Sequence, residues 1–254
     1  MSTSDTTNAL LTANDQLSAF QALGRGKTAE GGLQFPRGSS YGETVMQSLM
    51  GAHTPLLAAE GSYWTASNVP GTPITNAIVT GFVATTPTLV LFNSNPVGGK
   101  SIYPVRFKTQ IVAAGTTSSD FQGQILVDTG NRKTSGGTVL TAASPNLNVL
   151  NTATGAIITM GAITAPAANA SRIIHAQKYR SVIKVASDRY TWEFGGSVPV
   201  AQGAPLEGTL QVDMVIQVAP VCLPPQCSLI LYTYGTAMGT ADSMDFSTFE
   251  YVER

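Results

Sequence analysis

The side chains that could perform catalysis are few, and none has the spacing of a known catalytic site. Two aspartate pairs, Asp120 with Asp128 and Asp242 with Asp245, are the nearest candidates for hydrolysis. That chemistry needs two carboxyl groups flanking a cleft. Asp128 precedes Thr-Gly-Asn, and Asp242-Ser-Met-Asp245 has the composition of a loop, so turn formation is the favoured interpretation of both pairs.

The histidines and a glycine-rich segment give no better candidate. His53 and His175 are the only histidines, and neither has a nucleophile or carboxylate at a recognisable spacing, which favours structural roles. The segment 24–28, Gly-Arg-Gly-Lys-Thr, matches the end of a phosphate-binding loop, but Gln21 stands where that loop needs its first glycine. The sequence therefore predicts a protein that is not an enzyme and holds no cofactor.

Cys222 and Cys227 are separated by Leu-Pro-Pro-Gln, which predicts a turn between two strands. Three interpretations stay open: two free thiols, a local disulfide, or half of a metal site. A zinc site needs about four ligands, and both histidines are distant in sequence. Free thiols are favoured, and no metal site is expected.

Four aromatic residues are the best candidates for a binding surface: Trp64, Tyr190, Trp192 and Phe194. The last three alternate in Tyr-Thr-Trp-Glu-Phe, so they share one face of a strand. Such a face can pack in a core or a subunit interface, or it can stack on a sugar. Burial in a core or interface is favoured because alternating aromatic residues are common on covered sheet faces, and glycan stacking is the alternative.

Alternation of apolar and polar residues dominates the chain from residue 71 onward. It is clearest from Gly208 to Pro220, where every second residue from Leu210 to Val218 is apolar. Turn-forming residues separate the strand candidates, which are 76–83, 88–93, 101–114, 122–128, 138–141, 156–164, 171–177, 181–186, 190–195, 208–218, 228–234 and 246–252. We predict an all-β, antiparallel, jelly-roll-like β-sandwich over residues 71–254.

Residues 1–70 have a different character. Leu10 to Leu23 and Glu43 to Ala52 carry apolar residues at helical spacing, with a Gly-rich stretch between them. We predict an N-terminal arm with one or two short helices.

The composition limits the functions that this chain can have. Charged residues are 11% of the 254 residues and the formal net charge is −1, whereas ordinary soluble proteins are about 25% charged. A surface so poor in charge is easier to understand if other subunits cover part of it. A net charge near zero provides no electrostatic attraction for the phosphates of nucleic acid. No apolar run reaches the roughly 20 residues of a membrane helix. We expect neither a nucleic-acid nor a membrane partner.

Two segments carry a family resemblance: 60–74, Glu-Gly-Ser-Tyr-Trp-Thr-Ala-Ser-Asn-Val-Pro-Gly-Thr-Pro-Ile, and 99–108, Gly-Lys-Ser-Ile-Tyr-Pro-Val-Arg-Phe-Lys. Together with the small-residue arm and low-charge β domain, they resemble the shell proteins of small icosahedral viruses. Bacteriophage head-decoration proteins are a second match. The resemblance implies a virion protein, made in the host cytoplasm, whose partners are other copies of itself and other capsid proteins.

The arm differs from the basic arms that many such shell proteins place against the genome. Residues 1–40 hold three basic and three acidic residues, Arg25, Lys27, Arg37, Asp5, Asp15 and Glu30. A neutral arm suits contacts between subunits better than contacts with nucleic acid. We therefore expect a clamp that orders on a neighbouring subunit, and a glycan-binding or adhesin module is the alternative function.

Overall fold

The computed structural model describes residues 57–115, 120–147, 154–180, 184–195, 211–236, 238 and 240–254. The chain divides into two units, Met1–His53 and Thr54–Arg254, and all described residues belong to the second. The two helices predicted before residue 53 therefore lie outside the described residues.

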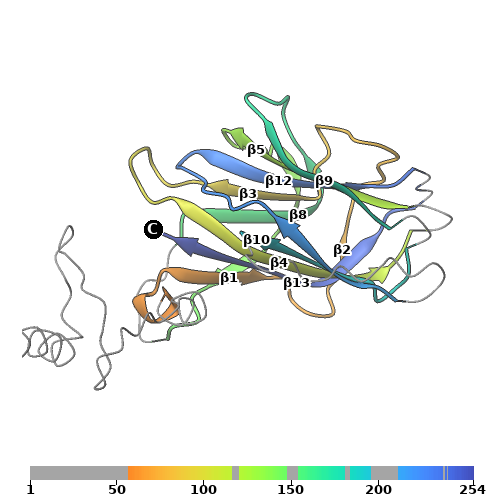
Figure 1. Ribbon diagram of the computed structural model, residues 1–254, viewed down its shortest axis with the longest axis horizontal. Helices are drawn as coiled ribbons and strands as arrows, with labels where there is room; N and C mark the ends of the chain where they lie inside the picture. Colours follow the sequence, from red (N-terminus) through yellow and green to blue (C-terminus); the bar gives the residue numbers. More distant parts are fainter. Residues whose placement is uncertain are drawn as a thin grey trace, which may run out of the picture. The chain divides into compact units, whose positions relative to one another are not determined.

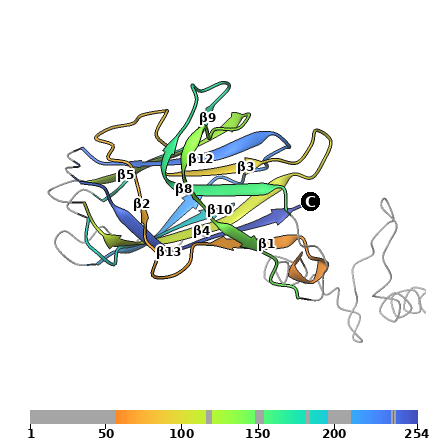
Figure 2. The same cartoon turned by 180° about the vertical axis from the view of Figure 1, so that it is seen from behind.

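The described residues form two sheets that pack face to face (Figures 1 and 2). The strands are β1 (Tyr63–Ser67), β2 (Ile74–Thr75), β3 (Leu89–Asn93), β4 (Ile102–Ala113), β5 (Phe121–Thr129), β6 (Ser135–Val139), β7 (Thr141–Ala143), β8 (Ala156–Thr164), β9 (Arg172–Arg180), β10 (Arg189–Phe194), β11 (Asp213–Val218), β12 (Cys227–Tyr234) and β13 (Ser243–Glu253). The first sheet has the order β11-β10-β4-β13-β1-β7, with β2 also paired to β13, and the second has the order β6-β8-β3-β12-β5-β9. The predicted all-β sandwich is confirmed.

A two-stranded ribbon links the sheets. Strand β4 pairs with β13 in the first sheet, and the strands next to them in sequence, β5 and β12, pair in the second sheet. The ribbon therefore wraps across both layers, as ribbons do in a jelly roll. One pair departs from the antiparallel prediction, because β10 and β11 run parallel. Parallel strands need a connection of a dozen or more residues, and residues 195–212 separate β10 from β11 in the sequence.

Several elements differ from the sequence prediction. Of the strand predicted at 208–218 the structure describes residues 211–218, and only 213–218 of these form a strand (β11). Strand β1, inside the segment assigned to the arm, pairs along its whole length with β13, so the sandwich begins before residue 71. The strand predicted at 76–83 is wrong, because these residues belong to a loop, here called the outer loop (residues 76–88). Residues 184–186 also form no strand, and 181–183 lie outside the described part.

The main core fills the space between the sheets, and alternation along β4 and β11 explains how. Phe107 and Ile111 of β4 and Met214 and Ile216 of β11 are buried there. Their neighbours in sequence point away from the core and are exposed or half-buried. Apolar and polar residues alternate along these strands because only one face of each strand is covered.

A second apolar cluster lies on the outer face of the second sheet, and it comprises Val90, Leu126, Ile163, Ile230 and Tyr232. The outer loop covers part of it and is visible above the upper sheet in Figure 1. The Tyr232 hydroxyl donates a hydrogen bond of 2.8 Å to the Ala84 carbonyl, and the Phe82 ring lies 5.0 Å from the Tyr232 ring. Apolar packing thus explains why this loop has a strand-like sequence without any strand pairing.

Candidate functional site

Three of the four aromatic residues singled out in the sequence lie in the core, and the fourth is half-buried. Trp64, Tyr190 and Trp192 are fully buried between the sheets, and Phe194 is half-buried with its ring 6.3 Å from that of Phe249. Tyr190, Trp192 and Phe194 share the face of β10 that is turned to the core, and Trp64 reaches the same core from β1. In this structure the three buried rings pack inside a single chain and are not exposed to a glycan or to another subunit.

The first aspartate pair fastens two separate loops. Asp120 accepts a hydrogen bond of 2.7 Å from the Thr236 backbone amide and forms an ion pair of 2.7 Å with Lys178. Asp128 accepts a hydrogen bond of 2.8 Å from the Ala170 amide and lies 3.4 Å from the buried Arg132 guanidinium. Both carboxylates are buried and already occupied by partners. They serve to hold loops in place.

The second pair acts in the same way. Asp242 accepts a hydrogen bond of 2.8 Å from the Gly115 amide and forms a buried ion pair with Lys184. Asp245 accepts one of 2.9 Å from the Gly71 amide. Each carboxylate compensates loop donors that would otherwise be buried without a partner. This geometry supports the turn interpretation over hydrolysis.

Asp120 gives a testable pH dependence. Burial alone would raise its pKa, but hydrogen bonds from Lys178, Thr236 and Gln122 outweigh burial and lower the pKa from 3.8 to about 2. Because the folded pKa lies below the unfolded one, the stabilisation is present above pH about 4 and is lost as the pH falls towards 2. In urea denaturation we expect Asp120→Asn to be less stable than wild type at pH 6. Between pH 5 and 2 its free energy of unfolding should fall less than that of wild type. Parallel curves for the two proteins would contradict this account.

The remaining candidates for chemistry are the histidines and the two cysteines. The His175 ring stacks on Tyr179 at 6.1 Å, and burial lowers its pKa, which favours the neutral form. His53 lies outside the described residues. Cys222 and Cys227 are both free thiols. Within the described ranges, no group of three His, Cys, Asp or Glu residues could hold a metal ion, and no helix is long and apolar enough to cross a membrane.

The outer face of the first sheet contains a depression of about 520 Å³, lined by Lys108, Thr109, Gln110, Arg189, Thr191, Asp213, Phe246 and Thr248. Strand register explains how these residues meet. Thr248 of β13 lies opposite Lys108 of β4, which lies opposite Thr191 of β10. These three residues form one row across three neighbouring strands.

The adjacent row supplies most of the charge. Gln110 of β4 lies opposite Arg189 of β10, which lies beside Asp213 of β11 in the parallel pair. Arg189 and Lys108 are diagonal neighbours on this face, at a separation that long side chains can bridge. Six other cations in the described part form ion pairs, but neither Lys108 nor Arg189 does. Among the described residues, the depression therefore presents two cations that form no ion pair, with the Asp213 carboxylate as the only anion in its lining.

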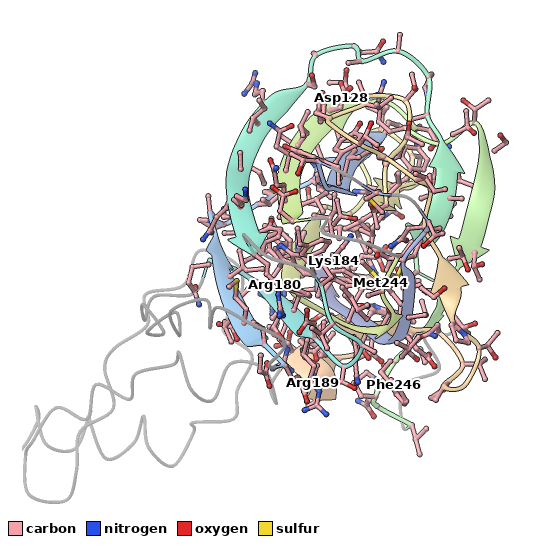
Figure 3. All side chains as sticks on the ribbon, turned by 90° about the vertical axis from the view of Figure 1, so that its right-hand side faces the viewer. Asp128, Arg180, Lys184, Arg189, Met244 and Phe246 are labelled. Atoms are coloured by element: carbon pink, nitrogen blue, oxygen red, sulfur yellow. The ribbon has the colours of Figure 1, made fainter. Side chains whose placement is uncertain are left out.

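Phe246 stands at the rim of the depression because of a β-bulge. The register of β13 against β4 shifts between Asp245 and Thr248, and Phe246 takes a φ of 51° with its side chain 54% exposed. Asp245 accepts a hydrogen bond of 2.6 Å from Asn68 and one of 2.7 Å from the Phe246 amide. Figure 3 shows Phe246 and Arg189 at the same end of the molecule. The bulge redirects an aromatic ring to the surface.

The sequence did not predict this site, although the alternation along its strands indicated part of the lining. Alternation along the predicted strand 101–114 puts Lys108 and Gln110 on the face opposite Phe107 and Ile111, and in the structure that face is the outer one. Phe246 was placed inside a regular strand at 246–252, and the bulge that exposes it leaves no mark on the apolar pattern. Only the pairing of β13 with β4 reveals it.

Comparison with known proteins identifies no relative. No family model, no curated protein and no solved structure matches this chain. Its function therefore has to be inferred from its own residues.

Proposed function

We propose that this protein is a non-enzymatic structural subunit of a virion, either a capsid protein or a capsid-decorating protein. It would associate with other copies of itself and with other capsid proteins. The observation that supports the proposal is that many of the few charged side chains are buried and hold loops in place. In the part of the chain that the structure describes, nine charged side chains are buried: Asp120, Asp128, Arg132, Arg180, Lys184, Asp188, Asp242, Asp245 and Glu253.

Burial of these charges leaves a surface even poorer in charged groups than the composition suggests. Only 11% of the residues are charged, and a neutral surface does little to keep copies of a protein apart. The buried charges fasten loops, so fewer charged side chains are left for the surface. Such a division suits a subunit whose outer faces are covered in an assembly.

The outer loop is the part of the surface best suited to that contact. Ile78 is 54% exposed, Phe82 44% and Val83 42%. The Phe82 ring packs on Tyr232 of the second apolar cluster and on Tyr234 beside it, so the loop extends an apolar surface that already begins beneath it. Apolar residues grouped in this way mark protein-protein contact sites. We assign the contact with a neighbouring subunit to this loop.

Light scattering across a concentration series tests the proposal. We expect the full chain to form a defined oligomer or a closed assembly. Replacing Phe82 and Val83 together by serine should raise the concentration needed for association at least about tenfold, the effect of about 1.4 kcal/mol. Val97→Ser, at an exposed site in another loop, is the matched control and should change nothing.

Two outcomes would contradict the proposal. The first is a chain that stays monomeric at every concentration, alone and with other shell proteins. The second is unchanged association of the double variant. Circular dichroism of each variant is needed as a check that the β fold is retained.

A further inference from the structure

The depression on the first sheet is chemically unlike the outer loop, and it lies on the other sheet of the sandwich. Its polar lining, unpaired cations and exposed ring do not suit the apolar subunit contact assigned above. The geometry points to a binding site for an acidic saccharide, in which Lys108 and Arg189 bind the sugar carboxylate and Phe246 stacks on the sugar ring. This inference is independent of the proposed assembly function.

Charge complementarity supports a ligand with a single negative charge. Lys108 and Arg189 contribute two positive charges to the depression and Asp213 contributes one negative charge, which leaves one positive charge in excess. An arginine guanidinium binds a carboxylate through two parallel hydrogen bonds. Asp213 would repel a polyanion such as nucleic acid, but it can accept hydrogen bonds from sugar hydroxyls.

The neutral residues of the lining fit the rest of a sugar. Gln110, Thr191 and Thr248 provide both donors and acceptors on the same face. The volume of about 520 Å³ is in the range of small-ligand sites. A peptide that adds a strand would pair with the edge strand β11, whereas this depression lies on the face of the sheet across β11, β10, β4 and β13.

The backbone at Phe246 is a further sign of a ligand site. A bulky residue at a φ of 51° costs free energy that its exposed ring does not recover by packing in this chain. Hydrogen bonds from Asn68 and Ser247 hold the bulge in this form: the Asn68 side-chain oxygen accepts a bond of 2.8 Å from the Ser247 amide. The bulge therefore maintains a strained conformation whose visible effect is to present an aromatic ring beside two cations.

A ligand-observed NMR titration of the full chain with two matched sugars tests the site. Methyl β-glucuronide carries the carboxylate, and methyl β-glucoside has the same ring without it. We expect saturable binding of the glucuronide at millimolar concentration and at least tenfold weaker binding of the glucoside. Arg189→Gln should weaken glucuronide binding at least tenfold, and Phe246→Gly should weaken it by a similar factor while relieving the backbone strain.

Arg172→Gln, which removes an exposed cation from β9 on the other sheet, is the matched control and should bind the glucuronide like wild type. Thermal unfolding of each variant checks that the fold is retained. Equal affinity for both sugars, binding that survives Arg189→Gln, or no binding of the glucuronide would each overturn the inference. If no sugar binds and Arg189→Gln instead weakens association in light scattering, the depression is a subunit contact and the saccharide site is excluded.

Discussion

Replacing Asp188 by alanine is expected to lower the free energy of unfolding by about 3–5 kcal/mol, because it leaves a buried charge without its partner. Both side chains of the Arg180–Asp188 ion pair are fully buried, and the guanidinium nitrogen lies 2.7 Å from a carboxylate oxygen. Asp188 also accepts hydrogen bonds of 2.9 Å from the backbone amides of Val185 and Val212. One side chain therefore satisfies a cation and two loop donors.

Urea denaturation at neutral pH measures the effect. Asp188→Asn keeps an acceptor oxygen for the amides but removes the charge, so it should be intermediate between wild type and alanine. Glu60→Ala is the matched control, since Glu60 and Arg254 are 60% and 47% exposed and such surface pairs contribute less than about 1 kcal/mol. A loss for Asp188→Ala as small as that for Glu60→Ala would show that the buried pair contributes little.

This ion pair illustrates which features the sequence can predict. Strand β8 has the same bounds as its prediction, 156–164, and β3 differs from its prediction by one residue, because apolar runs bounded by turn residues encode strands locally. Pairing of charges is not encoded locally. Lys184 and Asp242 are 58 residues apart in sequence, and only the packing of loops at the end of the sandwich joins them.

The wrongly predicted strand at 76–83 and the ambiguity about β10 share one physical cause. The outer loop has the apolar content of a strand because it packs on Tyr232 from outside the sheet, and a sequence pattern cannot distinguish that from a place inside the sheet. The same ambiguity affected β10. Alternation correctly put Tyr190, Trp192 and Phe194 on one face, but it could not determine whether that face was turned to the core or to a ligand. Phe246 was hidden for the opposite reason, since a bulge interrupts the alternation.

Trp192→Ala distinguishes these alternatives for β10, and we expect it to lower the free energy of unfolding by about 3–5 kcal/mol. Trp192 is fully buried, and its ring stacks on Phe107 with 5.3 Å between centroids and 19° between planes. Its indole nitrogen donates a hydrogen bond of 3.0 Å to the Tyr179 hydroxyl. Alanine would leave a large cavity and remove this bond, whereas Trp192→Phe keeps much of the volume and should cost less.

Chemical denaturation of both variants tests this expectation, with Phe82→Ala on the outer loop as the control for removal of an exposed aromatic ring. The control should cost well under half as much, because Phe82 is 44% exposed. Stability of Trp192→Ala close to wild type would mean that the ring is not in the core. If Trp192→Ala loses this much stability, its failure to bind a glycan would only report unfolding. Sugar binding therefore has to be tested with variants at the exposed depression.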